Sequence, residues 1–262
     1  MVTIAPATPK VIMSEAYLDE SDARKPHDEK ALLTVSGTNI SIASRTIVKN
    51  ATFSLVRNST LALIGPNGSG KTLLLKALLG LQPHTGLITW QPGTRLGYVP
   101  QNLSADPHLP LRARELLRAK AIVQKQPENE VEAVAAWVGC SDLLQQRLGA
   151  LSGGQLQLVL IAFALIGNPD VLLVDEPTSS LDERAEEQFL DLLKRMRRER
   201  GMTVVLVSHD LTLVRGFATH VLCLSAGQAV FGTAAEMLVP DMLERIYRQP
   251  VEFHLHGTRT TA

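Results

Sequence analysis

A glycine-rich segment carries the clearest chemistry in the sequence. It fits the pattern G-x-x-x-x-G-K-[ST] and consists of Gly65, Pro66, Asn67, Gly68, Ser69, Gly70, Lys71 and Thr72. The glycines allow the backbone to curl so that successive N–H groups point at phosphate oxygens. Lys71 can reach the β- and γ-phosphates of a nucleotide, and the Thr72 hydroxyl can ligate Mg²⁺. The alternative, a chance glycine turn, is expected in only roughly 1% of chains of this composition, so the segment indicates nucleotide binding.

A pair of carboxylates follows a second apolar run. Asp175 and Glu176 come directly after residues 171–174, which are Val, Leu, Leu and Val. At the end of a buried strand, Asp175 can join the shell of a Mg²⁺ ion, and Glu176 can polarise a water molecule for in-line attack on the γ-phosphate. Such a pair on its own is commonly a capping pair, but the phosphate loop upstream favours the catalytic interpretation.

A third segment provides a second anion-binding helix start. Leu151 is followed by Ser152, Gly153, Gly154 and Gln155. A serine and two glycines that open a helix direct backbone N–H groups at an anion. The chain therefore carries a second phosphate-binding helix start besides the one after the glycine-rich segment. A single ATP molecule could use both if two chains packed head to tail, which predicts a homodimer.

Together these motifs resemble the ATP-binding subunits of ABC transporters, whose signature is the sequence LSGGQ found here at residues 151–155. The resemblance covers nearly all of residues 31–240. It implies that Gln101 senses Mg²⁺ and water and contacts the membrane subunit, that Asp182 belongs to a further nucleotide-site loop, and that His209 contacts the γ-phosphate. A lone histidine after an apolar strand is more often a core or turn residue, so the role of His209 depends on the other motifs.

The resemblance also implies a biological role. Residues 95–101, 109–111 and 208–224 are similar to the ATPases of zinc and manganese importers. The implied function is ATP hydrolysis that drives solute transport through a separate integral membrane permease, namely import of a divalent metal such as zinc or manganese. An extracytoplasmic solute-binding protein would belong to the same system. The implied location is cytoplasmic, peripheral on the inner face of the cell membrane.

Two other classes of protein stay open. One is a soluble ABC ATPase without a transport role, for example of the iron–sulfur assembly type. The other is a regulatory nucleotide-binding module that does not hydrolyse ATP, and the presence of Glu176 and His209 argues against it. Genes that neighbour this one would distinguish a transport system from the first alternative.

Several positions depart from the family pattern. Ile42 stands where members usually carry an aromatic residue that stacks on adenine. Leu158 and Phe163 stand where arginines are usual, and Leu73 replaces a second hydroxyl after the lysine–threonine pair. None of these changes removes a reactive group. We therefore expect ATP hydrolysis to persist and the recognition of adenine to be weaker.

Alternating strands and helices must position these residues. Continuous apolar runs predict buried parallel strands, alternation predicts a half-exposed strand at 52–56, and glycines and prolines mark the helix ends. The expected strands are 52–56, 61–64, 87–90, 96–99, 171–174, 203–207 and 221–224. The expected helices are 71–79, 112–124, 130–138, 141–147, a helix from Ser152 to before Gly167, 183–200 and the chain after about 233. This order predicts an α/β P-loop NTPase core of ABC ATPase type, with an inserted helical subdomain and an antiparallel β portion.

The chain divides into three expected parts. Residues 1–30 mix prolines with charged residues and are expected to form a mobile N-terminal extension. Residues 31–240 are expected to form the ATPase domain, with the helical insert at about 102–150. Residues 241–262 are expected to form a C-terminal helix and tail. His254 and His256 in that tail could bind a metal, although a solvated tail is the favoured interpretation.

Composition and charge exclude several classes of protein. Lys+Arg and Asp+Glu are both 26, and the resulting net charge of zero argues against a nucleic-acid partner. Cys140 and Cys223 are the only cysteines, which excludes a disulfide framework and fits a reducing compartment. No apolar run approaches the roughly 20 residues that cross a bilayer. The basic run at 194–200 is expected to be the solvated end of a helix, and Trp90 and Trp137 are expected to pack.

Overall fold

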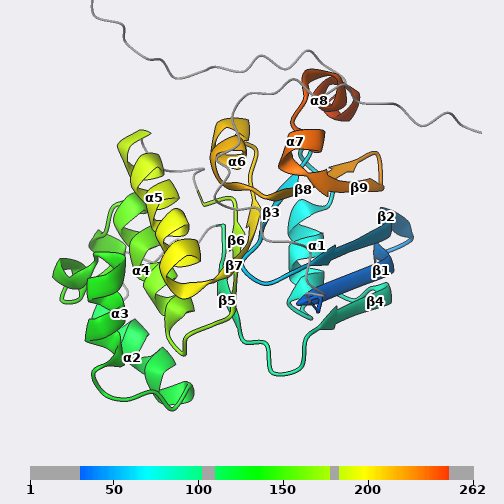
Figure 1. Cartoon of the computed structure of the whole chain (residues 1–262). Helices are drawn as coiled ribbons and strands as arrows, with labels where there is room; N and C mark the ends of the chain where they lie inside the picture. The colour runs from blue at the N-terminus through cyan, green and yellow to red at the C-terminus, as the bar shows by residue number, and fades with distance from the viewer. Residues whose placement is uncertain (1–29, 102–109, 178–182, 248–262) are drawn as a thin grey trace, which may run out of the picture. The chain divides into compact units, whose positions relative to one another are not determined.

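The computed structural model describes residues 30–101, 110–177 and 183–247. The described residues from Ala31 onward belong to one compact unit (Figure 1). Its strands form a nine-stranded sheet in the order β4-β1-β2-β9-β8-β3-β7-β6-β5. In Figure 1 the helical insert and the antiparallel strands β1, β2 and β4 lie on opposite sides of the central strands.

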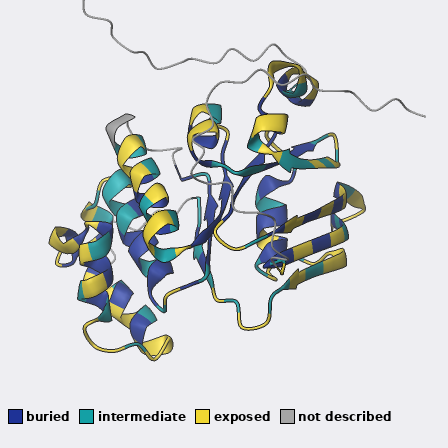
Figure 2. Ribbon diagram, in the orientation of Figure 1, coloured by how far each residue is buried: buried dark blue, intermediate teal, exposed yellow. Residues whose placement is uncertain are grey.

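The central strands are parallel and buried. They are β3 (Thr60–Ile64), β5 (Leu96–Val99), β6 (Val171–Asp175), β7 (Thr203–Val207) and β8 (His220–Ser225). Strand β3 pairs with β7 and β8, and β6 pairs with β5 and β7, all in parallel. Every residue of β3, β6 and β7 is buried (Figure 2). Because both faces of these strands are covered, the sequence shows continuous apolar runs there rather than alternation.

The antiparallel portion has one face in contact with the core. Its strands are β1 (Leu33–Ile42), β2 (Arg45–Leu55), β4 (Thr85–Trp90) and β9 (Gln228–Thr233). Strand β1 pairs antiparallel with β2 and β4, and β9 pairs antiparallel with β8. Buried and exposed residues mix along these strands (Figure 2). The strand expected at 52–56 is the end of the longer β2, while β1 and β9 were not among the expected strands because polar and apolar residues mix in both.

Different helices cover the two faces of the central sheet. Leu61 and Leu63 of β3 belong to an apolar cluster with α1 (Lys71–Leu78) and the strands β1 and β2. Ala62 and Ile64 of the same strand belong to a cluster with α6 (Leu211–Phe217), α7 (Ala234–Met237) and α8 (Pro240–Tyr247). The strand thus contributes alternate side chains to two cores.

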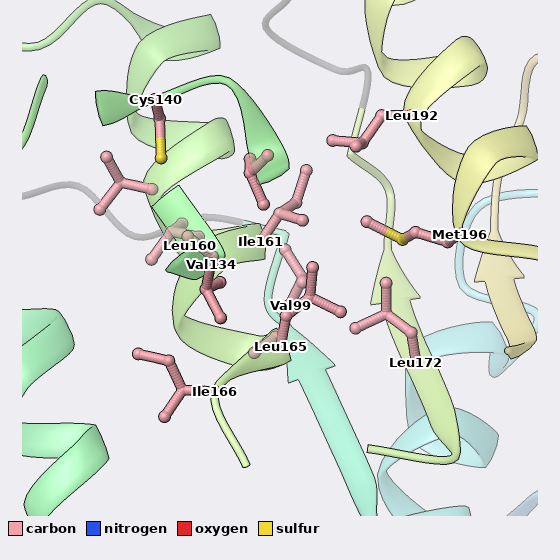
Figure 3. Packing of buried hydrophobic residues seen from close by; sticks show 14 of the residues in the cluster. Val99, Val134, Cys140, Leu160, Ile161, Leu165, Ile166, Leu172, Leu192 and Met196 are labelled. Carbon is pink, nitrogen blue, oxygen red and sulfur yellow. The ribbon is translucent and has the colours of Figure 1, made fainter. Parts of the chain in front are cut away.

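The helical insert shares a third apolar cluster with the sheet. The insert includes α2 (Ala113–Val123) and α3 (Glu130–Val138), and the chain then leads into α4 (Gly153–Leu165). Figure 3 shows the cluster from close by. Val134 of α3, Val99 of β5, Leu172 of β6 and Met196 of α5 (Glu183–Arg200) all belong to it. The insert is therefore joined to the sheet through one continuous core.

Part of the expected secondary structure is confirmed and part is wrong. The helices expected at 112–124, 130–138 and 183–200 are present, but the helix expected at 141–147 is not. The 3-10 turn Ser141–Leu143 lies in this region instead, and a second 3-10 turn, Leu148–Ala150, follows it. The reason is that its carbonyls bond elsewhere: Leu144 O accepts from Arg114 N (2.9 Å) and Gln146 O accepts from Ala113 N (3.0 Å). Helix α6 was not expected from the sequence.

Three further expectations concern the N-terminal extension, the C-terminal tail and membrane-spanning helices. The predicted N-terminal extension lies outside the described residues apart from Lys30, as does the C-terminal tail with His254 and His256. Within the described residues, the model contains no helix of the length and apolarity needed to cross a membrane.

Candidate active site

Strand order brings the chemically active segments to one edge of the sheet. The glycine-rich loop follows β3, His209 follows β7, Asp175 ends β6, and Gln101 follows β5. These strands are neighbours in the order β3-β7-β6-β5, and all are parallel. Their carboxyl ends therefore meet at the same edge, which is where open parallel sheets bind ligands.

The glycine-rich loop needs glycine at particular positions. Gly65, Gly68 and Gly70 have φ values of 141°, 76° and 102°, which side chains rarely adopt. A Cβ on Gly65 would lie 2.1 Å from Leu224 O, and a Cβ on Gly70 would lie 2.7 Å from Val48 Cγ2. The loop is thus packed against β8 and β2 so closely that only glycine fits, as its motif predicts.

Lys71 is a buried cation at the mouth of this loop. Its side chain is only 5% exposed, and its ammonium donates to Gly65 O (2.9 Å) and Pro66 O (3.2 Å). The nearest carboxylate oxygen, Glu176 Oε1, lies 4.0 Å from Nζ. Burial lowers the pKa of Lys71, and the charges of Glu176 and Asp175 oppose that shift. An anion bound at the loop would compensate this partly desolvated charge.

Thr72 and Asp175 place two oxygen ligands together. Thr72 Oγ1 donates to Asp175 Oδ1 at 3.1 Å, and Asp175 is 2% exposed. Burial raises the pKa of Asp175, the Thr72 hydrogen bond opposes this, and the nearby charge of Glu176 raises the pKa further. A hydroxyl and a buried carboxylate are hard oxygen ligands of the type that Mg²⁺ prefers. The donor set therefore fits the metal that the motifs imply.

Glu176 is held by both neighbouring strands. Its carboxylate accepts from Gln101 Nε2 at 2.6 Å, and its backbone N–H donates to Val207 O at 3.0 Å. Its φ of 41° lies in the left-handed region, which is unusual for a glutamate and requires support from surrounding contacts. The structure thus joins Gln101, Glu176 and Lys71, which sequence reasoning had connected only through their motifs.

A hollow of about 450 Å³ lies over these residues. Its lining includes Lys71, Thr72, Gln101 and Glu176 together with the apolar residues Ile42, Ile47 and Leu73 and the loop residues Asn67, Gly68 and Gly70. Ile42 is 51% exposed at the end of β1. The hollow thus combines charged and polar groups suited to phosphates with hydrocarbon surface suited to a base. Ser69 Oγ is buried nearby without a hydrogen-bond partner among the described residues.

Sequence reasoning missed several lining residues. Ile47 lines both this hollow and a second one of about 700 Å³, which Arg45 and Lys49 also line. All three lie on β2, next to the turn that follows Ile42. The sequence offers no local signal for them, because their place at the site depends on β2 lying beside the loop: Ile47 Cγ2 would lie 3.0 Å from a Cβ on Gly70.

The segment that follows Leu151 lies elsewhere. Ser152 is the N-cap of α4, where its Oγ accepts from Gln155 N (3.3 Å) while Gln155 Oε1 accepts from Ser152 N (2.9 Å). This capping box confirms the expected helix start. Ser152 is exposed, and neither it nor Gly153, Gly154 or Gln155 is among the residues that line the hollow over Lys71.

For two further expected site residues, His209 and Asp182, the predicted contacts with the nucleotide stay predictions. His209 is exposed two residues beyond Val207, the partner of Asp175 in the sheet, and is not among the lining residues. Asp182 lies outside the described residues.

Comparisons with known proteins agree with this geometry. A family model described as "ABC transporter" matches residues 48–179. The chain is 38% identical over 206 residues to the zinc import ATP-binding protein ZnuC of Roseobacter denitrificans, covering 78% of this chain and 80% of that protein. It also resembles a chain of an ABC transporter solved in an inward-facing conformation, with a TM-score of 0.78 and 26% identity over 84% of this chain and 90% of that one.

A second solved structure has the same fold. This is cbiO1 from Clostridium perfringens, part of the ABC transporter complex cbiONQ, with a TM-score of 0.70 and 25% identity over 83% of this chain and 94% of that one. The expected fold, an α/β P-loop core with a helical insert and an antiparallel portion, is thus confirmed by both the sheet order and these neighbours. The chain belongs to the ABC transporter family, as an ATP-binding subunit with ATPase activity of the transport-coupled type.

Proposed function

We propose that this chain hydrolyses ATP as a head-to-tail homodimer and that hydrolysis drives import of a divalent metal through a separate membrane permease. The observation that carries the proposal is the division of the motifs between two places. Lys71, Gln101 and Glu176 line one hollow, whereas the capped helix start at Ser152 is exposed and belongs to another part of the chain. A second chain is needed to bring a Ser152 to the same nucleotide.

Within one chain, the residues at the hollow bind the triphosphate and prepare the reaction. The amides of residues 65–70 and the Lys71 ammonium bind the phosphates. Thr72, Asp175 and Gln101 are the residues that would hold Mg²⁺, which would supply positive charge to neutralise the charge that develops on the phosphates. Glu176, oriented by Gln101 at 2.6 Å, accepts a proton from the attacking water.

The partner chain completes the site. Ser152, Gly153, Gly154 and Gln155 bind the phosphates of the nucleotide held by the other chain, since the N-terminal end of α4 offers N–H groups and a positive dipole end. We propose that His209, which follows β7 in the chain that supplies Lys71, contacts the γ-phosphate, and that Asp182 belongs to a further loop at the nucleotide. The capping box occupies the N–H groups of Ser152 and Gln155, so the N–H groups of Gly153 and Gly154 are the ones that we propose bind phosphate at this exposed helix end.

The transported solute is inferred from relatives. Proteins named as zinc import ATP-binding proteins are similar over most of this chain, so zinc is the proposed solute, with manganese as second choice. The relative cbiO1 is part of an ABC transporter complex, which supports a permease partner. We propose that this permease docks near Gln101 and α2. A solute-binding protein outside the cell and a position on the inner face of the membrane complete the proposal.

The proposal is tested in liposomes that contain the chain and the permease encoded beside it. Accumulation of radioactive zinc should require ATP and should be lost with Glu176→Gln, while Glu187→Gln, an exposed change on α5, should leave it intact. A manganese arm ranks the two metals. Hydrolysis that proceeds fully in the isolated monomer would contradict the dimer, and purification that never recovers a membrane protein would favour a soluble role.

A further inference from the structure

Trp137 joins the helical insert to the C-terminal end of α5. It lies near the end of α3, and its indole ring is covered by two guanidinium groups: Arg195 Cζ is 4.4 Å and Arg200 Cζ is 4.0 Å from the ring centroid. The indole Nε1 donates to Glu199 Oε2 at 3.2 Å. Arg195 also donates a hydrogen bond to the backbone carbonyl of Trp137. We call this set of contacts the tryptophan clamp.

The basic run at 194–200 is the end of α5, and its residues Lys194 and Arg198 are exposed, as expected. Arg195 and Arg200 are half-buried, and both of their guanidinium groups also contact the Trp137 ring. Burial lowers the pKa of Arg200, and the nearby charge of Arg195 acts in the same direction, while Glu130 and Glu199 oppose the shift. Two like charges held over one ring would repel each other without the electron-rich ring face and these carboxylates to compensate. The arrangement is therefore a specific contact.

Apolar packing is incomplete beside the clamp. A hollow of about 630 Å³ separates the end of α3, part of α4 and the middle of α5. It is lined by Val138 and Gly139 of the insert, Leu158 of α4, and α5 residues that include Asp191 and Lys194. Leu192 and Met196 contribute to the shared core below it (Figure 3). Beside this hollow, the tryptophan clamp adds a contact between the insert and α5 to those of the shared core.

The clamp joins α3, which precedes Ser152 and α4 in the chain, to α5, which follows Glu176. From Trp137 the chain continues through tight turns to Ser152, and these turns are held by backbone bonds such as Cys140 N to Ala135 O (2.9 Å) and Arg114 N to Leu144 O (2.9 Å). Helix α5 belongs to the segment that follows Glu176. A change at the clamp would therefore move the signature helix start relative to the phosphate-binding edge of the sheet.

We infer that Trp137 is a positioning residue: by clamping onto Arg195 and Arg200 it sets the orientation in which Ser152 is presented to the nucleotide of the second chain. This inference rests on the proposed head-to-tail dimer. It assigns Trp137 no contact with ATP. Loss of the clamp should weaken assembly of the composite site and leave nucleotide binding by the individual chain unchanged.

The test measures ATPase rate as a function of protein concentration. In Trp137→Leu and Arg200→Gln, the concentration that gives half-maximal specific activity should rise severalfold, because the apparent dissociation constant of the dimer increases as the fraction of chains in the competent orientation falls. The affinity of the single chain for ATP should match wild type.

Arg200→Lys, which keeps a cation over the ring, should recover most of the shift. Lys194→Gln is the matched control, since it removes one positive charge from the same helix, has no contact with Trp137 among the described residues and should not shift the curve.

The inference is overturned by either of two results. The first is an unshifted curve in both variants. The second is a loss of maximal rate at an unchanged midpoint, since that indicates only a smaller folded fraction. A Trp90→Phe background leaves Trp137 as the single tryptophan, and a red shift of its emission on Arg200→Gln verifies that the clamp has opened. If the wild-type chain forms no ATP-dependent dimer at all, the proposed function itself fails, which is a distinct outcome.

Discussion

The two ends of the nucleotide hollow are built on different principles. At the phosphate end, Lys71 and Asp175 are 5% and 2% exposed, and Glu176 is held in a left-handed backbone conformation by β7. At the other end, Ile42 is 51% exposed and offers hydrocarbon, as does Ile47. The phosphate end holds charged groups in fixed positions, whereas the other end offers only apolar side chains for contact with a base.

The difference shows which part of recognition is specific. Charges that are buried and hydrogen-bonded can act only on a ligand of matching charge and geometry, because leaving them unpaired is costly. An isoleucine side chain neither donates nor accepts a hydrogen bond, so it stabilises any base by a similar amount. We therefore expect the triphosphate to be recognised strictly and the base loosely.

The largest effect is expected at the phosphate end, from the substitution Glu176→Gln. The amide keeps the shape and can still contact Gln101, but it cannot accept a proton from water. ATP hydrolysis should fall at least tenfold, and loss of a general base commonly costs about 10²–10⁴ in rate. ATP binding should persist, since the loop and Lys71 are unchanged. Measurement of both quantities decides the matter: a variant that hydrolyses ATP at the wild-type rate removes Glu176 from the mechanism.

The same contrast explains how much could be predicted from the sequence. Lys71, Asp175 and Glu176 could be predicted as site residues because their spacing after buried apolar strands is a local signal. Strand β1 was missed because polar and apolar residues mix along it. The contribution of Ile47 was missed because it depends on β2 lying beside the phosphate loop, a contact between residues far apart in the chain. The two guanidinium groups over Trp137 were missed for the same reason: a basic helix end has the same sequence pattern whether or not a ring covers it.

The expected helix at 141–147 failed for a related reason. Its residues have no strand pattern, and local propensity favoured a helix. The backbone instead bonds to the segment before α2, through Leu148 N to Leu111 O (2.9 Å) and an isolated bridge between Arg112 and Arg147. Tertiary contacts of this type override propensity, which is only a weak prior.

A smaller effect, on nucleotide affinity, is expected at the base end from the substitution Ile42→Tyr. Stacking of an aromatic ring on a base is worth about 1–3 kcal/mol in single-strand binding, so ATP should bind severalfold more tightly to the variant. The wild-type chain should discriminate little between ATP and GTP, because Ile42 and Ile47 read neither base edge. Titration of both nucleotides against both proteins measures this.

A matched control for that change is Leu87→Tyr, which adds the same ring at a strand residue that is 54% exposed and not among the residues that line the hollow. It should leave both affinities unchanged. A wild-type preference for ATP above about tenfold, equivalent to 1.4 kcal/mol, or no gain from tyrosine at residue 42, would show that another residue contacts adenine.

The smallest expected effect concerns stability and arises at the phosphate end. Burial raises the pKa of Asp175, so the protonated carboxyl is favoured in the folded chain. The stability linked to this shift is present below the ordinary pKa of an aspartate and is lost as the pH rises through the raised value. At neutral pH, without nucleotide or metal, Asp175→Asn should therefore raise the unfolding midpoint, by about 2–4 °C if the change is near 1 kcal/mol. The gain should shrink as the pH falls towards 4, while hydrolysis is lost throughout.

Asp191→Asn, which removes an exposed carboxylate on α5, should show no such gain. Thermal melts of the three proteins across this pH range test the idea, and a destabilised Asp175→Asn at pH 7 would mean that the buried charge stabilises the empty site.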